Sequence, residues 1–302
     1  MDNRSIECQA RIASIGFFDG VHRGHLHLIR QLKEEARRRG MASLLVTFDR
    51  HPRTVVTPDF VPSLLTTLDE KLQLLRETEV DDIVVLPFTP ELSQQSAKAF
   101  MDQVLHEQLD VRALLLGYDH RFGHGGGTWE DYLQWGQETG IEVVRAEELP
   151  GAHVSSSQCR RLLMAGDVSA GSEMLGHPYS IAGKVVYGHQ VGHELGFPTA
   201  NIEFDAEKLL PAHGAYAVWV MLPDGTRHAG MLNIGNRPTI DNGSAVSVEV
   251  NLLHYDGNLY GQRITVEFVG RLREEQRFSS REELSRQLQK DKEMTEQILS
   301  ES

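Results

Sequence analysis

The chain has 302 residues, of which 40% are hydrophobic and 24% charged, a composition typical of globular proteins rather than disordered or fibrous ones. Its formal net charge of -13 argues against nucleic acid or an anionic membrane as a partner. The two cysteines, Cys8 and Cys159, form no C-x-x-C pair, which favours idle thiols in a reducing compartment. Neither a signal peptide nor a membrane span is recognisable in the sequence, so we expect a cytoplasmic protein.

Short apolar runs alternate with helical patterns through the first half of the chain. The runs predict buried strands at 12–18, 42–48, 83–88, 113–117 and 141–145. Helices are indicated at 96–106, at 129–139 and after the capping box Thr67–Glu70. This alternation predicts an α/β fold with a parallel, doubly wound sheet, whose ligands bind at the carboxyl ends of the strands.

Strand-like runs follow one another in the second half without helices between them. They lie at 181–187, 215–222, 228–234, 246–253 and 263–269, with hairpin-type turns at 223–225 and 256–258. Consecutive strands of this kind predict an antiparallel sheet or small β-barrel, and a polar C-terminal helix is expected at 280–299. At 302 residues the chain favours two domains, which we place at 1–168 and 172–302.

A glycine-rich string, GFFDGVHRGH at 16–25, lies between the first predicted strand and the first long helix. Its glycines let the backbone approach a ligand, and the helix start offers free N–H groups to an anion. His22 and His25 lie one turn apart, so both imidazoles can stabilise charge in a phosphoryl transfer. Two surface histidines or a zinc pair are the alternatives, although no third zinc ligand stands at a fitting spacing.

The string resembles the H-x-G-H signature of nucleotidyltransferases, in the form found in bacterial FAD synthetases. Three further segments are similar to that family: TFDRHP at 47–52, GYDHRFG at 117–123 and SSSQCR at 155–160. The resemblance implies a nucleotidyltransferase fold of the Rossmann-like type and adenylylation of FMN by ATP, with release of pyrophosphate. Because the FMN phosphate is anionic at neutral pH, this reaction needs positioning and charge stabilisation rather than a general base.

The resemblance also implies roles for individual residues of this first site. Catalysis falls to His22 and His25, ATP-phosphate binding to Gly16, Phe17, Asp19, Gly24, Ser155, Ser156, Ser157 and Arg160, and the flavin and nucleotide side to Asp119, Arg121 and Phe122. The chain departs from the family pattern at Phe17, where the family often has Asn, and at Ser157, where the family has Thr. The glycine loop 125–127 lacks the basic residues that are common there in the family.

Residues 183–201 carry a second candidate site, which consists of a strand, a glycine-bearing segment and an extended stretch fixed by Pro198. In extended backbone Thr199 and Asn201 point to the same side, and two neutral oxygen ligands suit a magnesium ion that already carries ATP phosphates and waters. Neither a Walker A string nor a protein-kinase catalytic loop is present in the sequence. An ordinary hairpin with Thr and Asn in its turn is the alternative.

The segment GFPTAN at 196–201 resembles the motif of riboflavin kinases, and segments 230–239, 259–261 and 271–278 are similar to the same family. The resemblance implies phosphorylation of riboflavin to FMN by ATP with Mg²⁺ at Thr199 and Asn201. It also implies a nucleotide loop formed by Gly188, Gly192, Gly196, Phe197 and Pro198, in which His193 replaces a frequent Arg. Together the two resemblances, which extend from residue 11 to about 293, identify the chain as a member of the bifunctional riboflavin kinase/FAD synthetase family.

Glu249 is the candidate general base of the kinase reaction. On the predicted strand it shares a face with Ser247 and Asn251, opposite the valines. A primary alcohol needs a base to take its proton in the transition state, and Glu249 matches the catalytic Glu of the family; a solvated strand glutamate is the alternative. Two other interpretations of the whole chain are a kinase with an altered synthetase half and a non-catalytic flavin sensor.

Overall fold

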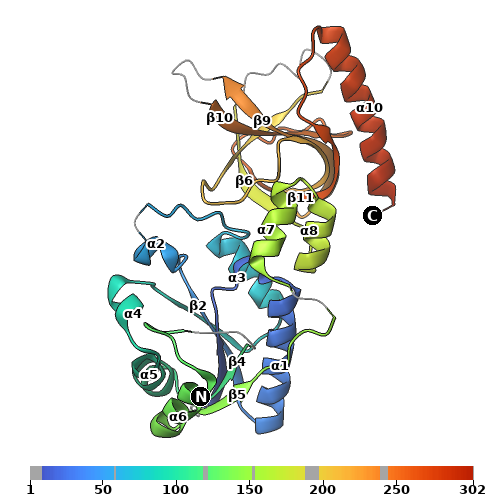
Figure 1. Ribbon diagram of the computed structural model, residues 1–302. Helices are drawn as coiled ribbons and strands as arrows, with labels where there is room; N and C mark the ends of the chain where they lie inside the picture. Colours follow the sequence, from blue (N-terminus) through green and yellow to red (C-terminus); the bar gives the residue numbers. More distant parts are fainter. Residues whose placement is uncertain are drawn as a thin grey trace, which may run out of the picture. The chain divides into compact units, whose positions relative to one another are not determined.

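The computed structural model describes residues 9–57, 59–117, 122–151, 154–187, 197–238 and 244–301. The chain divides into two compact units, Met1–Val154 and Ser155–Ser302 (Figure 1). This division falls before the predicted domain limits of 1–168 and 172–302, because two helices that follow Val154 make most of their contacts with the second unit. That residues 172–302 alone suffice for kinase activity stays a prediction.

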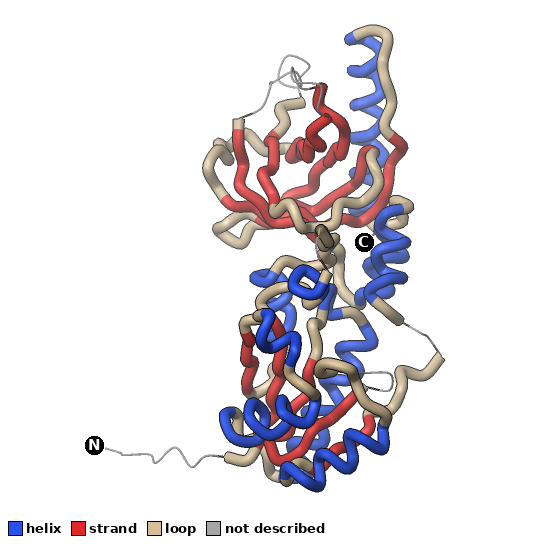
Figure 2. Tube along the Cα trace, turned by 60° about the vertical axis from the view of Figure 1, so that its left-hand side comes forward, coloured by secondary structure: helices blue, strands red, loops and turns tan. Residues whose placement is uncertain are grey.

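The first unit is built on a parallel sheet, whose strands are red in Figure 2. The sheet has five strands in the order β3-β2-β1-β4-β5. Its strands are β1 (Arg11–Ile15), β2 (Ala42–Phe48), β3 (Asp82–Leu86), β4 (Val111–Leu116) and β5 (Glu142–Arg145). The predicted parallel, doubly wound sheet is confirmed. Strand order reverses between β1 and β4, so the carboxyl end of β1 lies at the switch point where such folds bind ligands.

Helices connect these strands much as the sequence predicts. They are the 3-10 turn η1 (Asp19–Val21), α1 (Arg23–Arg39), α2 (Arg53–Val56), α3 (Leu68–Glu77), α4 (Pro90–Gln94), α5 (Ala97–Ala99), the π-helix η2 (Phe100–Gln108) and α6 (Trp129–Thr139). The predicted capping box is present, since Thr67 and Glu70 bond each other's backbone at the start of α3. The helix expected at 96–106 begins with Ser96 as its cap but continues as a π-helix.

Successive residues of the sheet face two different helical layers. Ile12 belongs to a core that includes Ile29 and Leu32 of α1, whereas Ala13 belongs to a core that includes Phe100 and Met101 of η2. Burial on both faces explains why these strands read as continuous apolar runs rather than as alternating patterns.

The second unit is a six-stranded closed antiparallel barrel in the order β10-β7-β6-β11-β8-β9, which confirms the predicted barrel. Its strands are β6 (Ser180–Val186), β7 (Ala200–Phe204), β8 (Gly214–Met221), β9 (Arg227–Pro238), β10 (Ser244–Leu252) and β11 (Arg263–Glu274). Helices α7 (Ser156–Met164) and α8 (Val168–Leu175) precede it and α10 (Arg281–Ser300) follows it. The sequence indicated β7 only as an extended segment.

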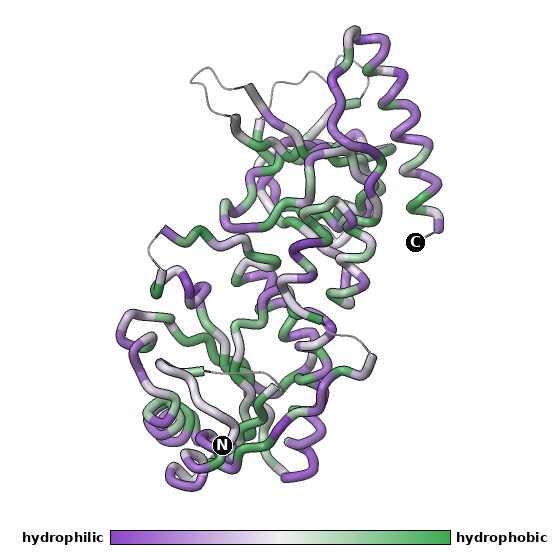
Figure 3. Tube along the Cα trace, in the orientation of Figure 1, coloured by the Kyte–Doolittle hydropathy of each residue, from purple (hydrophilic) through white to green (hydrophobic). Residues whose placement is uncertain are grey.

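Helix α10 is largely hydrophilic along its length (Figure 3). A buried ion pair fastens it to the barrel, because Asp291 is 3% exposed and accepts hydrogen bonds from Arg273 of β11, with Nε and Oδ2 2.9 Å apart.

Within the described ranges, none of the helices combines the length and the apolar character needed to cross a bilayer.

Candidate functional site

The backbone between β1 and α1 is strained. Phe18 (φ 54°), Gly20 (φ 77°) and Val21 (φ 39°) all have positive φ. For a residue with a Cβ, and above all for a β-branched valine, such values are unfavourable and persist only where the surroundings fix them. Strain of this kind clusters at functional sites, and this loop lies at the switch point of the sheet.

Asp19 holds one side of this loop. Its Oδ1 accepts hydrogen bonds from the backbone N–H groups of Leu65 at 2.9 Å and Thr66 at 3.1 Å, and the N–H of Gly20 donates to the Thr66 hydroxyl at 3.0 Å. The Asp19 side chain is buried. These contacts give Asp19 a structural part, and its assignment to ATP phosphates stays a prediction.

His22 and His25 lie together at the start of α1. His22 caps the helix, with Nδ1 accepting from the His25 backbone N–H at 3.3 Å, so the neutral His22 ring carries its proton on Nε2. The two rings stack with centroids 3.6 Å apart. A Cβ on Gly24 would lie 3.2 Å from the His22 ring, and one on Gly16 would lie 3.0 Å from the Phe18 ring. The absence of a side chain at Gly16 and Gly24 therefore leaves room for the Phe18 and His22 rings.

Lys71 of α3 also contacts the loop, and the sequence analysis missed it. Its Nζ donates to the carbonyl oxygens of Phe17 at 3.1 Å and Phe48 at 2.8 Å, and lies 4.1 Å from the centroid of the Phe17 ring. Burial lowers the pKa of Lys71 to about 8, against the opposing influence of the Asp19 and Asp49 carboxylates. A lysine beside an apolar helix stripe gives no sequence signal that separates it from a solvated one.

The remaining predicted residues of the first site are less directly described. Ser155 is the N-cap of α7, and its hydroxyl accepts from the Gln158 N–H within a capping box. Ser156, Ser157 and Arg160 follow in the first turns of that helix, which belongs to the second compact unit. Phe122 stacks on Tyr132 with centroids 5.0 Å apart. Asp119 and Arg121 lie outside the described residues.

Strand pairing in the barrel brings the second set of predicted residues together. Asn201 of β7 lies directly opposite Glu249 of β10, and the Thr199 hydroxyl donates to Oε2 of Glu249 at 3.4 Å. Asn251, which the sequence analysis placed on the same strand face without a role, donates from Nδ2 to the Pro198 carbonyl at 2.7 Å. This hydrogen bond fixes the chain where it enters β7.

The amide oxygen of Asn201 has the character of a ligand atom. Asn201 is 5% exposed, and its Oδ1 accepts no hydrogen bond from the residues that the structure describes. A buried acceptor without a partner costs about 1–3 kcal/mol, which a bound cation would offset. With the nearby Thr199 hydroxyl, the donor set fits a hard divalent cation that carries most of its other ligands with it.

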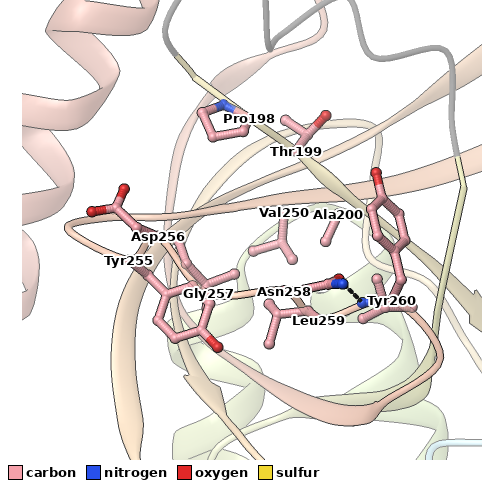
Figure 4. A pocket seen from close by; sticks show the side chains of 12 residues that line it. Pro198, Thr199, Ala200, Val250, Tyr255, Asp256, Gly257, Asn258, Leu259 and Tyr260 are labelled. Atoms are coloured by element: carbon pink, nitrogen blue, oxygen red, sulfur yellow. Dashed lines mark hydrogen bonds between the residues drawn. The ribbon is translucent and has the colours of Figure 1, made fainter.

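Two cavities of the barrel unit share Thr199. The first, which we call the loop cavity, has a volume of about 460 Å³ and is lined by Pro198, Thr199, Ala200, Val250 and the loop from Tyr255 to Tyr260 (Figure 4). The second, which we call the helix cavity, has a volume of about 290 Å³ and is lined by residues that include Phe197, Thr199, Asn233, Glu249, Phe278, Leu284 and Leu288. Of these two cavities, Glu249 lines only the helix cavity. The predicted loop residues Gly188, Gly192, His193 and Gly196 lie outside the described residues.

A parallel α/β unit with a histidine-bearing loop at its switch point, followed by a barrel with a Thr–Asn–Glu cluster, defines a two-part phosphate-transfer enzyme. Residues 5–158 match the family model described as FAD synthetase, and residues 175–299 match the one described as riboflavin kinase. The chain belongs to the family of bifunctional riboflavin kinase/FMN adenylyltransferases.

Relatives in this family match nearly the whole chain. The protein of Pseudomonas fluorescens with that name is 38% identical, over 94% of this chain and 91% of that one. The one of Escherichia coli K12 is 36% identical, over 93% and 90%. A crystal structure of a protein from Streptococcus pneumoniae, named there as a macrolide-efflux protein, has the same fold, with a TM-score of 0.86 and 26% identity over 95% of this chain and 94% of that one.

Proposed function

We propose that this chain phosphorylates riboflavin to FMN with one ATP and adenylylates FMN to FAD with a second, and that it does so in the cytoplasm. The observation that carries the proposal is the meeting of Thr199, Asn201 and Glu249 across β7 and β10. Thr199 and Asn201 belong to the segment that resembles riboflavin kinases, and Glu249 matches the catalytic Glu of that family. The family membership of the whole chain supports the second reaction.

The two cavities divide the kinase substrates between them. A general base must reach the hydroxyl that it deprotonates, so the helix cavity, which contains Glu249, takes riboflavin, and the aromatic and aliphatic side chains of Phe278, Leu284 and Leu288 suit a flavin ring. The loop cavity then takes ATP. Thr199 lines both cavities, which is where the γ-phosphate and the hydroxyl must meet.

In the kinase reaction, Glu249 accepts the proton of the terminal ribityl hydroxyl as its oxygen attacks the γ-phosphorus of ATP. The bond from that phosphorus to the β–γ bridging oxygen breaks, and ADP leaves. Thr199 and Asn201 hold Mg²⁺, which when bound neutralises charge on the phosphate oxygens. The resemblance assigns the nucleotide loop to Phe197 and Pro198 together with Gly188, Gly192 and Gly196.

In the adenylyltransferase reaction, a phosphate oxygen of FMN attacks the α-phosphorus of ATP, and pyrophosphate leaves. His22 donates from Nε2 and His25 lies beside it, so both stabilise charge on the phosphates. The resemblance assigns ATP-phosphate binding to Gly16, Phe17, Asp19, Gly24, Ser155, Ser156, Ser157 and Arg160, and the flavin and nucleotide side to Asp119, Arg121 and Phe122. Mg²⁺ accompanies ATP in this reaction too.

Separation of the products formed from riboflavin, ATP and Mg²⁺ by reverse-phase chromatography tests the proposal. We expect FMN to appear first and FAD to follow. FMN alone would favour a kinase whose first unit has another acceptor, and neither product would favour a flavin-binding protein without catalysis.

A further inference from the structure

The charged side chain of Lys71 is almost completely buried. The residue is 2% exposed, and its hydrogen-bond partners are two backbone carbonyl oxygens. Within the described part of the chain it forms no ion pair; the Asp19 and Asp49 carboxylates act on it only at longer range. Burial of an ammonium group without a direct counter-ion is costly, so packing alone would be served better by an apolar side chain.

The two carbonyl groups that Lys71 binds lie at the carboxyl ends of neighbouring strands. Phe48 ends β2, and Phe17 follows β1, which pairs with β2 in the sheet. The Phe17 carbonyl also accepts from the Thr47 hydroxyl at 3.2 Å. Lys71 therefore ties the beginning of the strained loop to the adjacent strand.

The opposite side of the same loop is held by residues that shortly precede Lys71 in the chain. Leu65 and Thr66 donate their N–H groups to Asp19, and Thr66 accepts from Gly20. The positive φ angles begin at Phe18 and end at Val21. Segment 65–71 therefore forms hydrogen bonds both to Phe17, before this strained stretch, and to residues within it. The residue after Val21 is His22, the cap of α1.

We propose that Lys71 is a positioning residue for adenylyl transfer, whose charged side chain fixes the loop that presents His22 and His25 to the phosphates. The inference rests on the proposed adenylyltransferase function of that loop. Lys71 acts through the Phe17 carbonyl and ring and need not touch a substrate.

The protonation state of Lys71 should make the rate of FAD formation depend on pH. Because burial lowers the pKa of Lys71 to about 8, the ammonium is intact below that pH and is lost as the pH rises through it. The charged groups that act on it are Asp19 of η1 and Asp49 after β2, both of which favour the ammonium. The phosphate of FMN, with a second pKa of about 6, titrates below this window.

The test measures FAD formation from FMN and ATP between pH 6.5 and 10 for the wild type, Lys71→Arg and Lys71→Met. For the wild type, kcat/KM should fall above pH 8, approaching about tenfold per pH unit. Lys71→Arg, whose guanidinium keeps its proton, should show no such fall. Lys71→Met should lose on the order of 10²-fold in kcat at pH 7, as for a misplaced reacting group.

The same preparations supply the controls. Riboflavin phosphorylation should keep its wild-type rate and pH profile in both variants. Lys33→Met is the matched variant, because Lys33 also donates to a backbone carbonyl, that of Thr78, but lines a cavity with Ser43 and Asp82 at the amino ends of β2 and β3. It should leave FAD formation unchanged.

Three results would overturn the inference: a flat wild-type profile between pH 7 and 9.5, the same alkaline fall in Lys71→Arg, or near-normal FAD synthesis by Lys71→Met. Even if both variants unfold, a flat wild-type profile would refute the inference, with the kinase reaction in the same buffers as the control. A wild-type protein that makes no FAD would refute the proposed function instead.

Discussion

Glu249→Gln should slow riboflavin phosphorylation while it leaves the fold of the barrel intact. Glutamine keeps an oxygen that can accept from the Thr199 hydroxyl, now 3.4 Å from Oε2, and it keeps the side-chain volume in the helix cavity. Because Glu249 is half-buried rather than enclosed, the stability of the barrel should change by less than about 1 kcal/mol.

The magnitude of the effect follows from the lost proton acceptor. General base catalysis contributes on the order of 10²–10⁴-fold, so kcat for FMN formation should fall by that factor, which raises the barrier by about 3–5 kcal/mol. Riboflavin and ATP should still bind, since neither cavity changes shape. The product assay is chromatographic, with riboflavin and ATP at saturating concentrations.

Two controls make the test specific. Supplied with FMN instead of riboflavin, Glu249→Gln should form FAD at the wild-type rate, because the FMN phosphate needs no base. Glu267→Gln is the matched variant, since Glu267 is also a half-buried barrel glutamate but pairs with Arg227 at 3.1 Å and lines neither cavity. Near-normal phosphorylation by Glu249→Gln, or an equal loss of FAD synthesis from FMN, would refute the assignment.

Three further predictions concern the two sites and their separation. His25→Ala should abolish FAD formation from FMN and spare phosphorylation of riboflavin, whereas His27→Ala, two residues along α1, should spare both; loss of both activities in a folded His25→Ala protein would contradict the two-site model. Asn201→Ala should raise the Mg²⁺ concentration for half-maximal kinase rate by about 10- to 100-fold, and an unchanged Mg²⁺ titration would remove Asn201 from the metal site. Residues 172–302 alone should convert riboflavin to FMN, but with a lower melting temperature than 155–302, which retains α7 and the whole of α8; a folded 172–302 fragment without kinase activity would count against the domain assignment.

The sequence predicted the architecture of both units because their patterns are local. Buried parallel strands read as apolar runs, and successive strands without helices read as a barrel. The capping box at Thr67 follows from residues three positions apart. Strand β7 was missed as a strand because its five residues, Ala200–Phe204, follow Pro198 and carry too little alternation to separate a strand from an extended loop.

The candidate sites, too, could be predicted only in part from the sequence. Thr199, Asn201 and Glu249 were found separately, but their meeting depends on the register between β7 and β10, which a single sequence does not fix. Lys71 was missed altogether, since its partners are backbone carbonyl groups distant in the chain. Because residues of every type have a backbone carbonyl, such a partner cannot be recognised from the residue types in the sequence.

The different nucleophiles of the two reactions account for the different side chains of the two sites. Riboflavin brings a neutral hydroxyl, so the barrel needs a carboxylate that can take a proton, and Glu249 stands open to a cavity. FMN brings an anion, and an exposed carboxylate beside it would repel both FMN and ATP. The acidic residue of that loop, Asp19, is instead buried, bonded to backbone N–H groups and faced by the charge of Lys71. In a chain of net charge -13, this arrangement leaves the histidine pair and the start of α1 to set the local potential in the proposed phosphate site.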